Sequence, residues 1–409
     1  MEYALVFWHI YDYIAILAIT LQILFLFNTY QNYHYALKKS GRQRPEYQPR
    51  TLLTVPCKGI DISFDENITS LFNLDYDNYF LNLVVEDASD PAYVRLCGLR
   101  DRFKSNSKAL NVRVLVAGHA VGCSQKIHNL LYSCSNAPDD IEVFAFADSD
   151  AQIQPDWLNF LVYPLRKSKN GATTGYRWFV PEKNNLASLV LSSINAKIAQ
   201  LLGRSIFNQA WGGAMAIRAE TFYRIGLDKV WQKALSDDLC LSRTVKKNHM
   251  KIVFAPGCLV ASYEKTTWPK LLEFTRRQFL ITRVVMPGTW CFGLVSSIYA
   301  LSGLWGGAAL AIYAGLTGKA NLKLYAAVPV LFFVGQTIRA ALRQRMVIKL
   351  LHHDAHKMKY AVITDILGNC IWSWVLFGCI VASAFGRSIS WRGVRYELTS
   401  PTETKILKK

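Results

Sequence analysis

The stretch Ile141-Glu142-Val143-Phe144-Ala145-Phe146-Ala147-Asp148-Ser149-Asp150 is the part of the sequence that decides the fold. Its first seven residues are mostly apolar, as in a strand that is buried on both faces. The run then leads directly into two carboxylates one residue apart. Such a pair at a strand end can hold a hard divalent cation and leave positions free for phosphate oxygens. The alternative is a turn or a helix cap that leads to Pro155.

Three more apolar runs precede this stretch, and segments with helical spacing separate them. This alternation predicts an α/β fold with a doubly wound open sheet, in which these four strands are parallel and ligands bind beyond their carboxyl ends. The predicted strands are residues 51–56, 81–86, 112–117 and 141–147, and the predicted helices are 65–73, 91–104 and 126–135, with caps at Asp65 and Ser124.

Acidic residues also follow a second strand and open a later helix. Glu86-Asp87 end the run at 81–86, where a carboxylate can accept hydrogen bonds from a nucleotide base or ribose. Ser236-Asp237-Asp238 precede a helix-like run at 239–247. One of these two acids is expected to cap that helix, and the other is free to act as a general base toward an alcohol. Taken alone, the pair is consistent with either role.

Composition narrows the class of protein. The chain has 409 residues, of which 51% are hydrophobic, and Lys+Arg 47 against Asp+Glu 29 leaves a net charge of +18. This excludes a disordered chain and favours anionic partners such as lipid head groups, nucleic acid or a phosphate-bearing substrate. The nine cysteines form no CxxC pair, which argues against a zinc site and a disulfide framework. Much of the basic surplus flanks apolar runs, so no nucleic-acid partner is expected.

An apolar run at residues 4–27 is long enough to cross a membrane as a helix. It is followed by Lys38, Lys39, Arg42, Arg44 and Arg50, whereas the residues before it carry no Lys or Arg. The positive-inside rule therefore predicts an uncleaved anchor with a cytoplasmic domain behind it.

Apolar runs return at residues 290–316, 324–338 and 361–385, with a basic stretch before the last. Three full crossings here would leave the C-terminal tail on the opposite side from the domain. Either one run re-enters without spanning, or the positive-inside interpretation of the basic stretch is wrong.

The chain resembles the ceramide glucosyltransferases, within the family 2 group of glycosyltransferases with the GT-A fold. The resemblance extends over nearly the whole chain, including the anchor and the C-terminal hydrophobic cluster. The motifs that carry it are Val55-Pro56-Cys57-Lys58-Gly59-Ile60-Asp61, Leu74-Asp75-Tyr76, Glu86-Asp87-Ala88-Ser89-Asp90-Pro91-Ala92, Gln125-Lys126-Ile127-His128-Asn129-Leu130, Asp148-Ser149-Asp150, Ser236-Asp237-Asp238 and Ile389-Ser390-Trp391-Arg392-Gly393-Val394-Arg395-Tyr396.

This resemblance implies an inverting transferase that moves glucose from UDP-glucose to ceramide or a similar lipid, with Mn²⁺ or Mg²⁺ as cofactor. By it, Asp87 binds the nucleoside, Asp148 and Asp150 the metal-bridged diphosphate, and Asp238 deprotonates the acceptor. The remaining candidates for the donor, the diphosphate or the acceptor are Lys58, Lys126, Trp211, Trp391, Arg392 and Tyr396.

One motif departs from the family pattern, which has Gln or Arg, two residues, and then Arg-Trp. Here Arg277 can take the first place, but Leu280-Ile281 stand where Arg-Trp is expected. Arg276, Gln278 and Arg283 are the other candidates near the acceptor. The alternatives are therefore transfer to another lipid (diacylglycerol, a polyisoprenyl phosphate or a sterol-like lipid) or a polysaccharide synthase.

The expected organisation is an integral membrane protein of the bacterial inner membrane, or of the Golgi if the host is eukaryotic. Its expected parts are an anchor at 1–30, a basic linker at 31–50, a GT-A domain at 51–267, an interfacial amphipathic helix at 268–288, membrane helices at 289–386 and a tail at 387–409.

Overall fold

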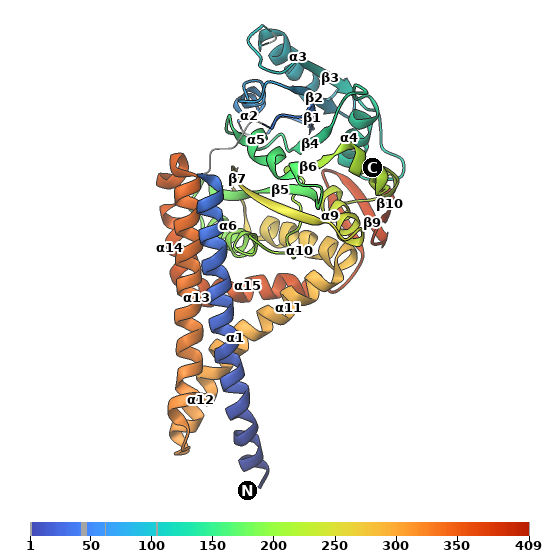
Figure 1. Ribbon diagram of the computed structural model, residues 1–409. Helices are drawn as coiled ribbons and strands as arrows, with labels where there is room; N and C mark the ends of the chain where they lie inside the picture. The colour runs from blue at the N-terminus through green and yellow to red at the C-terminus, as the bar shows by residue number, and fades with distance from the viewer. Residues whose placement is uncertain (1, 42–46, 62, 104, 409) are drawn as a thin grey trace.

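The computed structural model describes residues 2–41, 47–61, 63–103 and 105–408 of the chain. Figure 1 shows three parts: an α/β domain, long helices that extend away from it, and a group of helices (α10, α11, α15) beneath the sheet. Arg42 and Arg44 of the predicted basic run, and the predicted helix end at residue 104, lie outside the described residues.

The α/β domain is built on a sheet whose described strands have the order β3-β2-β1-β4-β6-β5-β7. The four predicted strands are confirmed, and they pair in parallel. A further strand that the sequence did not predict, β6, runs antiparallel to β4 and to β5. The strands are β1 (Thr51–Pro56), β2 (Tyr79–Val85), β3 (Asn111–Val116), β4 (Val143–Ala147), β5 (Asn170–Pro181), β6 (Ala214–Arg218) and β7 (Lys251–Glu264).

Helices cover both faces of this sheet. As a result, alternate residues of each strand point into two separate cores. Leu53 and Ala145 lie in one core, whereas Leu52 and Phe144 lie in the other. The domain is therefore doubly wound, as predicted. Its helices are α2 (Phe64–Ser70), α3 (Pro91–Phe103), α4 (Gln125–Ser135), α5 (Trp157–Val162), η1 (Tyr163–Arg166), α6 (Leu186–Ala199), α7 (Ala219–Arg224), α8 (Leu227–Trp231) and α9 (Asp237–Lys247).

The two predicted helix caps differ in outcome. The hydroxyl of Ser124 accepts a hydrogen bond from the Ile127 amide and caps α4, as expected. Asp65 does not cap α2, because the helix begins one residue earlier and the N-cap position is Ser63 with φ 54°. Asp65 instead lies in the first turn and pairs with Arg95.

Within the described residues, three helices are long and apolar enough to cross a membrane: Val6–Ser40, Pro287–Leu316 and Leu322–Leu350. The first belongs to α1 (Glu2–Ser40), so residues 31–40 continue the anchor helix, and the prediction of a linker from residue 31 is wrong for them. The run predicted at 324–338 is part of a much longer helix. The helices are α11 (Pro287–Leu301), the π-helical turn η2 (Ser302–Gly306), α12 (Gly307–Leu316) and α13 (Leu322–Leu350).

The last apolar run does not continue straight. The segments His352–Leu367 and Asn369–Ala382 meet at an angle of 86°, as in a broken or re-entrant span. Consequently α15 lies beneath the α/β domain, and the chain end returns to that domain (Figure 1). This favours the first of the two explanations for the tail. The elements are η3 (His352–Met358), α14 (Lys359–Leu367) and α15 (Asn369–Ala382).

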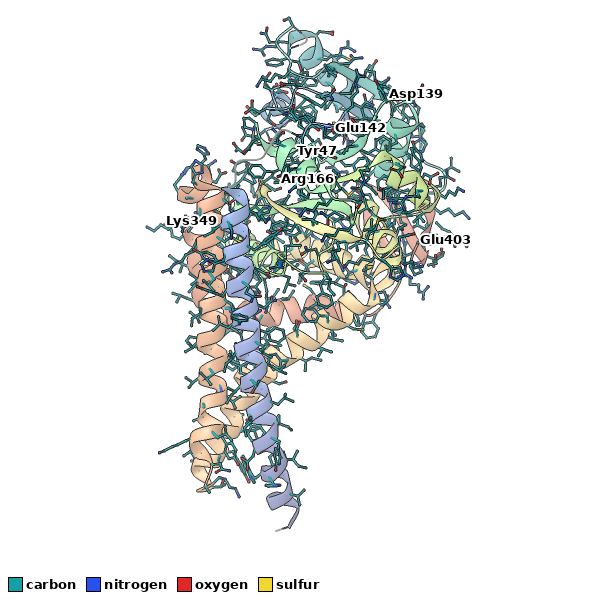
Figure 2. The ribbon with its side chains drawn as sticks, viewed as in Figure 1. Tyr47, Asp139, Glu142, Arg166, Lys349 and Glu403 are labelled. Carbon is teal, nitrogen blue, oxygen red and sulfur yellow. The ribbon has the colours of Figure 1, made fainter. Side chains whose placement is uncertain are left out.

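The C-terminal residues form a small antiparallel sheet of β8 (Ser388–Trp391), β9 (Val394–Ser400) and β10 (Glu403–Lys408). Ile389 and Leu398 enter a core of the α/β domain, and the amide of Thr404 donates to the Lys233 carbonyl at 2.8 Å. The tail is thus an integral part of the domain surface. Lys349, near the end of α13, lies at the height of the same domain (Figure 2), so the basic end of α13 is on the domain side.

Helix α10 (Trp268–Val285) joins the α/β domain to the long apolar helices. It lies beneath the sheet, and Leu271 packs with residues of α6 and α15. The helix ends at Val285, and α11 begins at Pro287, close to the predicted boundary at 288.

Candidate active site

The end of β4 places Asp148 beside a lysine from α4. The Nζ atom of Lys126 lies 2.7 Å from Oδ1 of Asp148 and 3.0 Å from Oδ2 of Asp237. Burial opposes the charge on Lys126, but the two carboxylates outweigh it and raise its pKa. Burial would also raise the pKa of Asp148, but Lys126 outweighs it and the pKa is lowered. The structure therefore brings together residues from α4, β4 and α9.

Asp237 was expected only as a possible cap, yet it is one of the buried acids of this cluster. Its side chain is 6% exposed. Burial has the largest effect on the pKa of Asp237 and raises it to about 6. The charges of Asp238 and Asp148 also raise this pKa, whereas Lys126 lowers it. A sequence signal existed in the two adjacent acids, but nothing in it showed which one faces Lys126.

Asp238 is held by three hydrogen bonds at the start of α9. Its Oδ1 accepts from the Ser236 hydroxyl at 2.5 Å and from the Leu239 amide at 2.7 Å, and its Oδ2 accepts from the Gly212 amide at 3.2 Å. Ser236 is itself the N-cap of α9. The prediction that one acid caps while the other is free is therefore wrong in detail, because Asp238 takes part in the cap and also faces the loop at Gly212.

That loop fits against the acids because it carries two glycines. A Cβ atom on Gly212 would lie 2.4 Å from Asp237 Oδ2, and one on Gly213 would lie 2.7 Å from Asp148 Oδ2. Only glycine allows the backbone to approach this closely. The preceding Trp211 is 9% exposed, and its ring centroid is 5.9 Å from that of Tyr176.

Asp150 faces a different cation from Asp148. Its Oδ2 lies 3.9 Å from Nη1 of Arg177, on β5, while its buried Oδ1 has no hydrogen-bond partner among the described residues. Burial and the nearby Asp148 raise the pKa of Asp150, against the opposing effect of Arg177. Nothing in the sequence shows that Arg177 comes close to Asp150, because β6 separates β5 from β4 in the sheet.

The side chains of Asp148 and Asp150 are suitable ligands for a divalent cation. Among the described residues, no three His, Cys, Asp or Glu side chains gather as a complete metal site. Asp148 and Asp150 offer two carboxylates, and one oxygen of Asp150 is buried without a partner. Two carboxylates with open positions suit a cation that also binds a ligand's phosphate oxygens. The donor set therefore fits Mn²⁺ or Mg²⁺ that is shared with a bound diphosphate.

A second polar cluster follows β1 and β2. Glu86 accepts hydrogen bonds from Lys58 Nζ at 3.0 Å and from His119 Nδ1 at 2.6 Å. Burial alone would raise the pKa of Glu86, but these two partners lower it. Asp87 accepts from the Ser89 amide at 2.7 Å, and this contact lowers its pKa. Lys58 therefore pairs with Glu86, and Asp87 lies at the end of the neighbouring strand, β2.

The C-terminal sheet reaches this strand edge through Arg392. Its Nη1 donates to the Lys58 carbonyl at 2.8 Å, and its Nη2 lies 3.3 Å from Oδ2 of Asp61. Trp391 is partly buried and packs against the core, while Tyr396 is 3% exposed within it. The ring of Tyr396 belongs to the packing of the tail, and its expected contact with a ligand stays a prediction.

The candidate arginines of α10 contact different parts of the protein. Arg276 donates to the carbonyls of Ala382 at 3.1 Å and Phe385 at 2.9 Å, and Arg283 donates to that of Gly386. These two arginines hold the chain after α15, and their expected role near the acceptor stays a prediction. Gln278 is exposed.

Arg277 is the arginine of α10 that remains near the site. Its Nη1 donates to the Ser390 carbonyl of the C-terminal sheet at 3.3 Å. Burial lowers its pKa, and the charges of Arg177 and Arg392 act in the same direction, against Glu273. Arg277 therefore shares its surroundings with the two arginines nearest the acidic cluster.

Solved structures similar to this chain include three transferases or synthases. The mannosyltransferase PcManGT from Pyrobaculum calidifontis, in complex with GDP-Man and Mn²⁺, is 15% identical with a TM-score of 0.44, covering 91% of this chain and 97% of that one. GalNAc-T7 with UDP, GalNAc and Mn²⁺ is 14% identical with a TM-score of 0.40, covering 57% and 48%. Glucosyl-3-phosphoglycerate synthase from Mycobacterium tuberculosis is 13% identical with a TM-score of 0.36, covering 57% and 82%.

A protein-family model also matches nearly the whole chain. Residues 15–404 match glycosyl transferase family 21, which spans the anchor, the α/β domain and the C-terminal sheet. The predicted resemblance is thereby confirmed at the level of the family. The GT-A type of α/β fold is confirmed as well, with acidic residues after β2 and β4 of a mainly parallel sheet. This chain is a glycosyltransferase that belongs to glycosyl transferase family 21.

Proposed function

We propose that this glycosyltransferase transfers glucose from UDP-glucose to the hydroxyl of ceramide or a similar lipid, with inversion at the anomeric carbon. The observation that carries the proposal is the convergence of Asp148, Asp237 and Asp238 around Lys126 at the edge of the sheet. Arg277 connects this edge to α10, which lies beside the membrane helices. This connection supports an acceptor hydroxyl that approaches the site from the membrane interface.

The donor diphosphate is bound by cations that surround the acids. Arg177, Arg277 and Arg392 influence one another's charge and supply fixed positive groups, and Lys126 remains protonated. A divalent cation held by Asp148 and Asp150 would neutralise part of the negative charge on the leaving diphosphate. Asp87, at the end of β2, is in the position to accept hydrogen bonds from the nucleoside.

Asp238 serves as the general base for the acceptor. In this step the lipid oxygen forms a bond to the anomeric carbon, the bond from that carbon to the diphosphate oxygen breaks, and UDP departs with the bonding pair. The hydroxyl proton passes to Asp238. The amide of Gly212 and the hydroxyl of Ser236 hold the carboxylate in one orientation.

The proposed location is a membrane with the α/β domain in the cytoplasm. The cations Lys38 and Lys39 end α1 on the domain side, and the end of α13 is basic on that side too. With three crossings the N-terminus lies on the opposite side. The bacterial inner membrane and the Golgi membrane both fit this arrangement.

A different lipid acceptor is the second candidate, because Leu280 and Ile281 occupy the place of the expected Arg-Trp. Both are buried in the hydrophobic core and present no polar group to an acceptor. An acceptor that needs fewer polar contacts, such as diacylglycerol, is compatible with this packing.

The experiment uses the full chain in detergent with a panel of UDP-sugars and lipids, in the presence of Mn²⁺, Mg²⁺ or EDTA. Mass spectrometry identifies the product, and Asp238→Asn is the inactive control. We expect a hexosyl lipid formed from UDP-glucose and a ceramide. A product on diacylglycerol alone would select the second candidate, and long saccharide chains without lipid would contradict both.

A further inference from the structure

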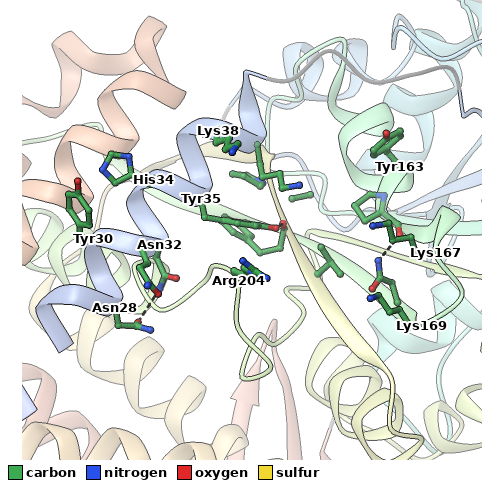
Figure 3. Close-up of a pocket in the computed structure, with 18 of the residues that line it drawn as sticks. Asn28, Tyr30, Asn32, His34, Tyr35, Lys38, Tyr163, Lys167, Lys169 and Arg204 are labelled. Atoms are coloured by element: carbon green, nitrogen blue, oxygen red, sulfur yellow. Dashed lines mark hydrogen bonds between the residues drawn. The ribbon is translucent and has the colours of Figure 1, made fainter. Parts of the chain in front are cut away.

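A cavity of about 1000 Å³ lies apart from the acidic cluster, between α1 and the α/β domain. Residues of α1 from Phe27 to Lys39 form one wall. The opposite wall comes from the chain at 163–170, the loop after α6 and the first half of β7. Figure 3 shows Lys38 at one end, Lys167 and Lys169 on the domain side, and Arg204 between the two walls.

This cavity is distinct from the proposed active site. Asn170, at the start of β5, lines the cavity, whereas Arg177, further along the same strand, lies beside Asp150. Seven residues of strand correspond to roughly 23 Å. A donor bound at Asp148 therefore does not reach the cavity.

The cavity is strongly cationic. Its described lining contains six Lys or Arg side chains and neither Asp nor Glu: Lys38, Lys39, Arg166, Lys167, Lys169 and Arg204. Among the described residues, Lys38, Lys167, Lys169 and Arg204 have no acidic partner within ion-pair distance. These four cations come from three separate elements and converge without an ion-pair partner among the described residues, which favours an anionic ligand.

The walls of the cavity are fixed by specific contacts. The Tyr35 hydroxyl crosses from α1 to donate to the Phe254 carbonyl at 2.9 Å. Asn32 donates to the Gln200 carbonyl at 3.1 Å, and a Cβ atom on Gly203 would lie 2.0 Å from the Asn32 Oδ1. These contacts hold α1 and the loop that carries Arg204 at a constant separation.

The position along α1 indicates where the anion comes from. Phe27 ends the apolar run of the anchor and is 56% exposed, and Tyr30 is 49% exposed. From Phe27 to Lys39 the helix rises about 18 Å. One end of the cavity thus lies where α1 leaves its apolar stretch, and the cations lie further from that level. Aromatic side chains at the interface with basic groups above them suit a membrane lipid with an anionic head group.

We propose that this cavity binds the phosphate head group of an anionic membrane phospholipid, with Lys167, Lys169 and Arg204 as its main cationic contacts. The lipid would hold the α/β domain against α1 at a fixed height above the membrane. The proposal does not depend on the sugar donor or the acceptor.

The test uses the full chain in a neutral detergent, titrated with dihexanoyl phosphatidylserine, dihexanoyl phosphatidylcholine or inorganic phosphate. Calorimetry measures the affinity, and the melting temperature provides a second readout. The anionic lipid is expected to bind and to raise the melting temperature, while the neutral lipid and phosphate bind at least about tenfold more weakly.

The variants K167E/K169E and R102E/K229E distinguish a built site from general charge. Arg102 and Lys229 are exposed and lie outside the cavity. K167E/K169E is expected to weaken binding of the anionic lipid at least about tenfold, and the matched control to leave it unchanged. R204A, from a separate element, is expected to give a smaller loss. Equal binding of free phosphate, or equal losses in both double variants, would overturn the proposal.

Discussion

Two regions of this molecule bury charged side chains, and they do so differently. At the strand edge, Asp148, Asp150 and Asp237 gather around Lys126 and Arg177, and Oδ1 of Asp150 is buried without a described partner. Where α6, α13 and α14 meet, Arg343 and Asp365 form an ion pair with side chains that are 2% and 0% exposed.

The ion pair in the helical region, Arg343–Asp365, is satisfied by partners within the protein, and we call it the closed pair. Arg343 binds Asp365 through two nitrogens, Gln344 donates to the same carboxylate at 2.7 Å, and Arg343 donates to Oε1 of Gln200 at 2.9 Å. Both oxygens of Asp365 are therefore satisfied within the protein. The comparison teaches that burial of charge does not by itself mark a functional site. A site that takes a ligand leaves charged groups incompletely satisfied, because the ligand completes them.

The largest expected effect is a loss of turnover when a carboxylate at the strand edge is replaced. Asp238→Asn should lower turnover about 10²–10⁴-fold, because the amide cannot take the acceptor proton. The melting temperature should fall only slightly, since the Asn oxygen still accepts from Ser236 and Leu239 at the start of α9, and only the hydrogen bond from the Gly212 amide is lost. Steady-state kinetics and a thermal melt on the same preparation check both parts. Wild-type turnover in this variant would remove Asp238 from the mechanism.

The next effect concerns the closed pair. Asp365→Asn leaves Arg343 buried without its counter-charge and should cost about 3–5 kcal/mol of stability. The double variant Arg343→Met/Asp365→Leu removes both charges and should recover most of that loss. Denaturant unfolding of the detergent-solubilised chain measures the difference. Loss of donor binding in folded Asp365→Asn would show that this region is more than structural.

A third prediction concerns the acidic cluster at the strand edge and the divalent cation proposed to bind there. Asp150→Asn should weaken Mn²⁺-dependent UDP binding at least about tenfold, because one of the two oxygen donors loses its charge. EDTA should reduce UDP binding to the wild-type protein to the same level. Asp75→Asn, an exposed site that pairs with Lys108, provides the control. UDP binding that is indifferent to both EDTA and Asp150→Asn would contradict a cation at this position.

The smallest expected effect is a pH dependence of folding stability that arises from Lys197, which lies near the closed pair. Burial, with Arg343 and Arg339 acting in the same direction, lowers the pKa of Lys197 to about 7 from an ordinary 10.5. Between these values the unfolded chain holds a proton that the folded chain lacks, so stability should rise with pH across that window.

Solvent reaches part of the Lys197 side chain, so the rise should be only a few degrees in melting temperature. Thermal melts of the wild type and Lys197→Met at pH 7 and pH 9 measure it. The rise should disappear in the variant. An identical pH profile in both proteins would show that Lys197 stays charged.

Much of the fold follows from local pattern. The runs at β1, β2, β3 and β4 were predictable because a buried parallel strand is apolar along its whole length. The acids after β2 and β4 were predictable at one edge of the sheet, since parallel strands end at the same edge. The antiparallel β6 was not, because a short apolar run has no direction in the sequence.

The candidate site was predictable only in part. Asp148, Asp238 and Lys126 were identified through motifs, but Asp237 and Arg177 reach the cluster through the positions of α9 and β5. The arginines of α10 illustrate the limit. Arg276, Arg277 and Arg283 are equivalent in composition, and their roles differ because helical rotation turns each toward a different neighbour.

The amino-acid sequence determined the alternation of strands and helices, the apolar helices and the family, because these depend on composition, periodicity and motifs along the chain. The tertiary structure alone decided which charged groups meet. It bent the last apolar run at Gly368, satisfied Asp365 completely, left Asp150 incomplete and assembled a cationic cavity from three distant segments. Long-range packing sets these pairings, and no local pattern in the sequence records it.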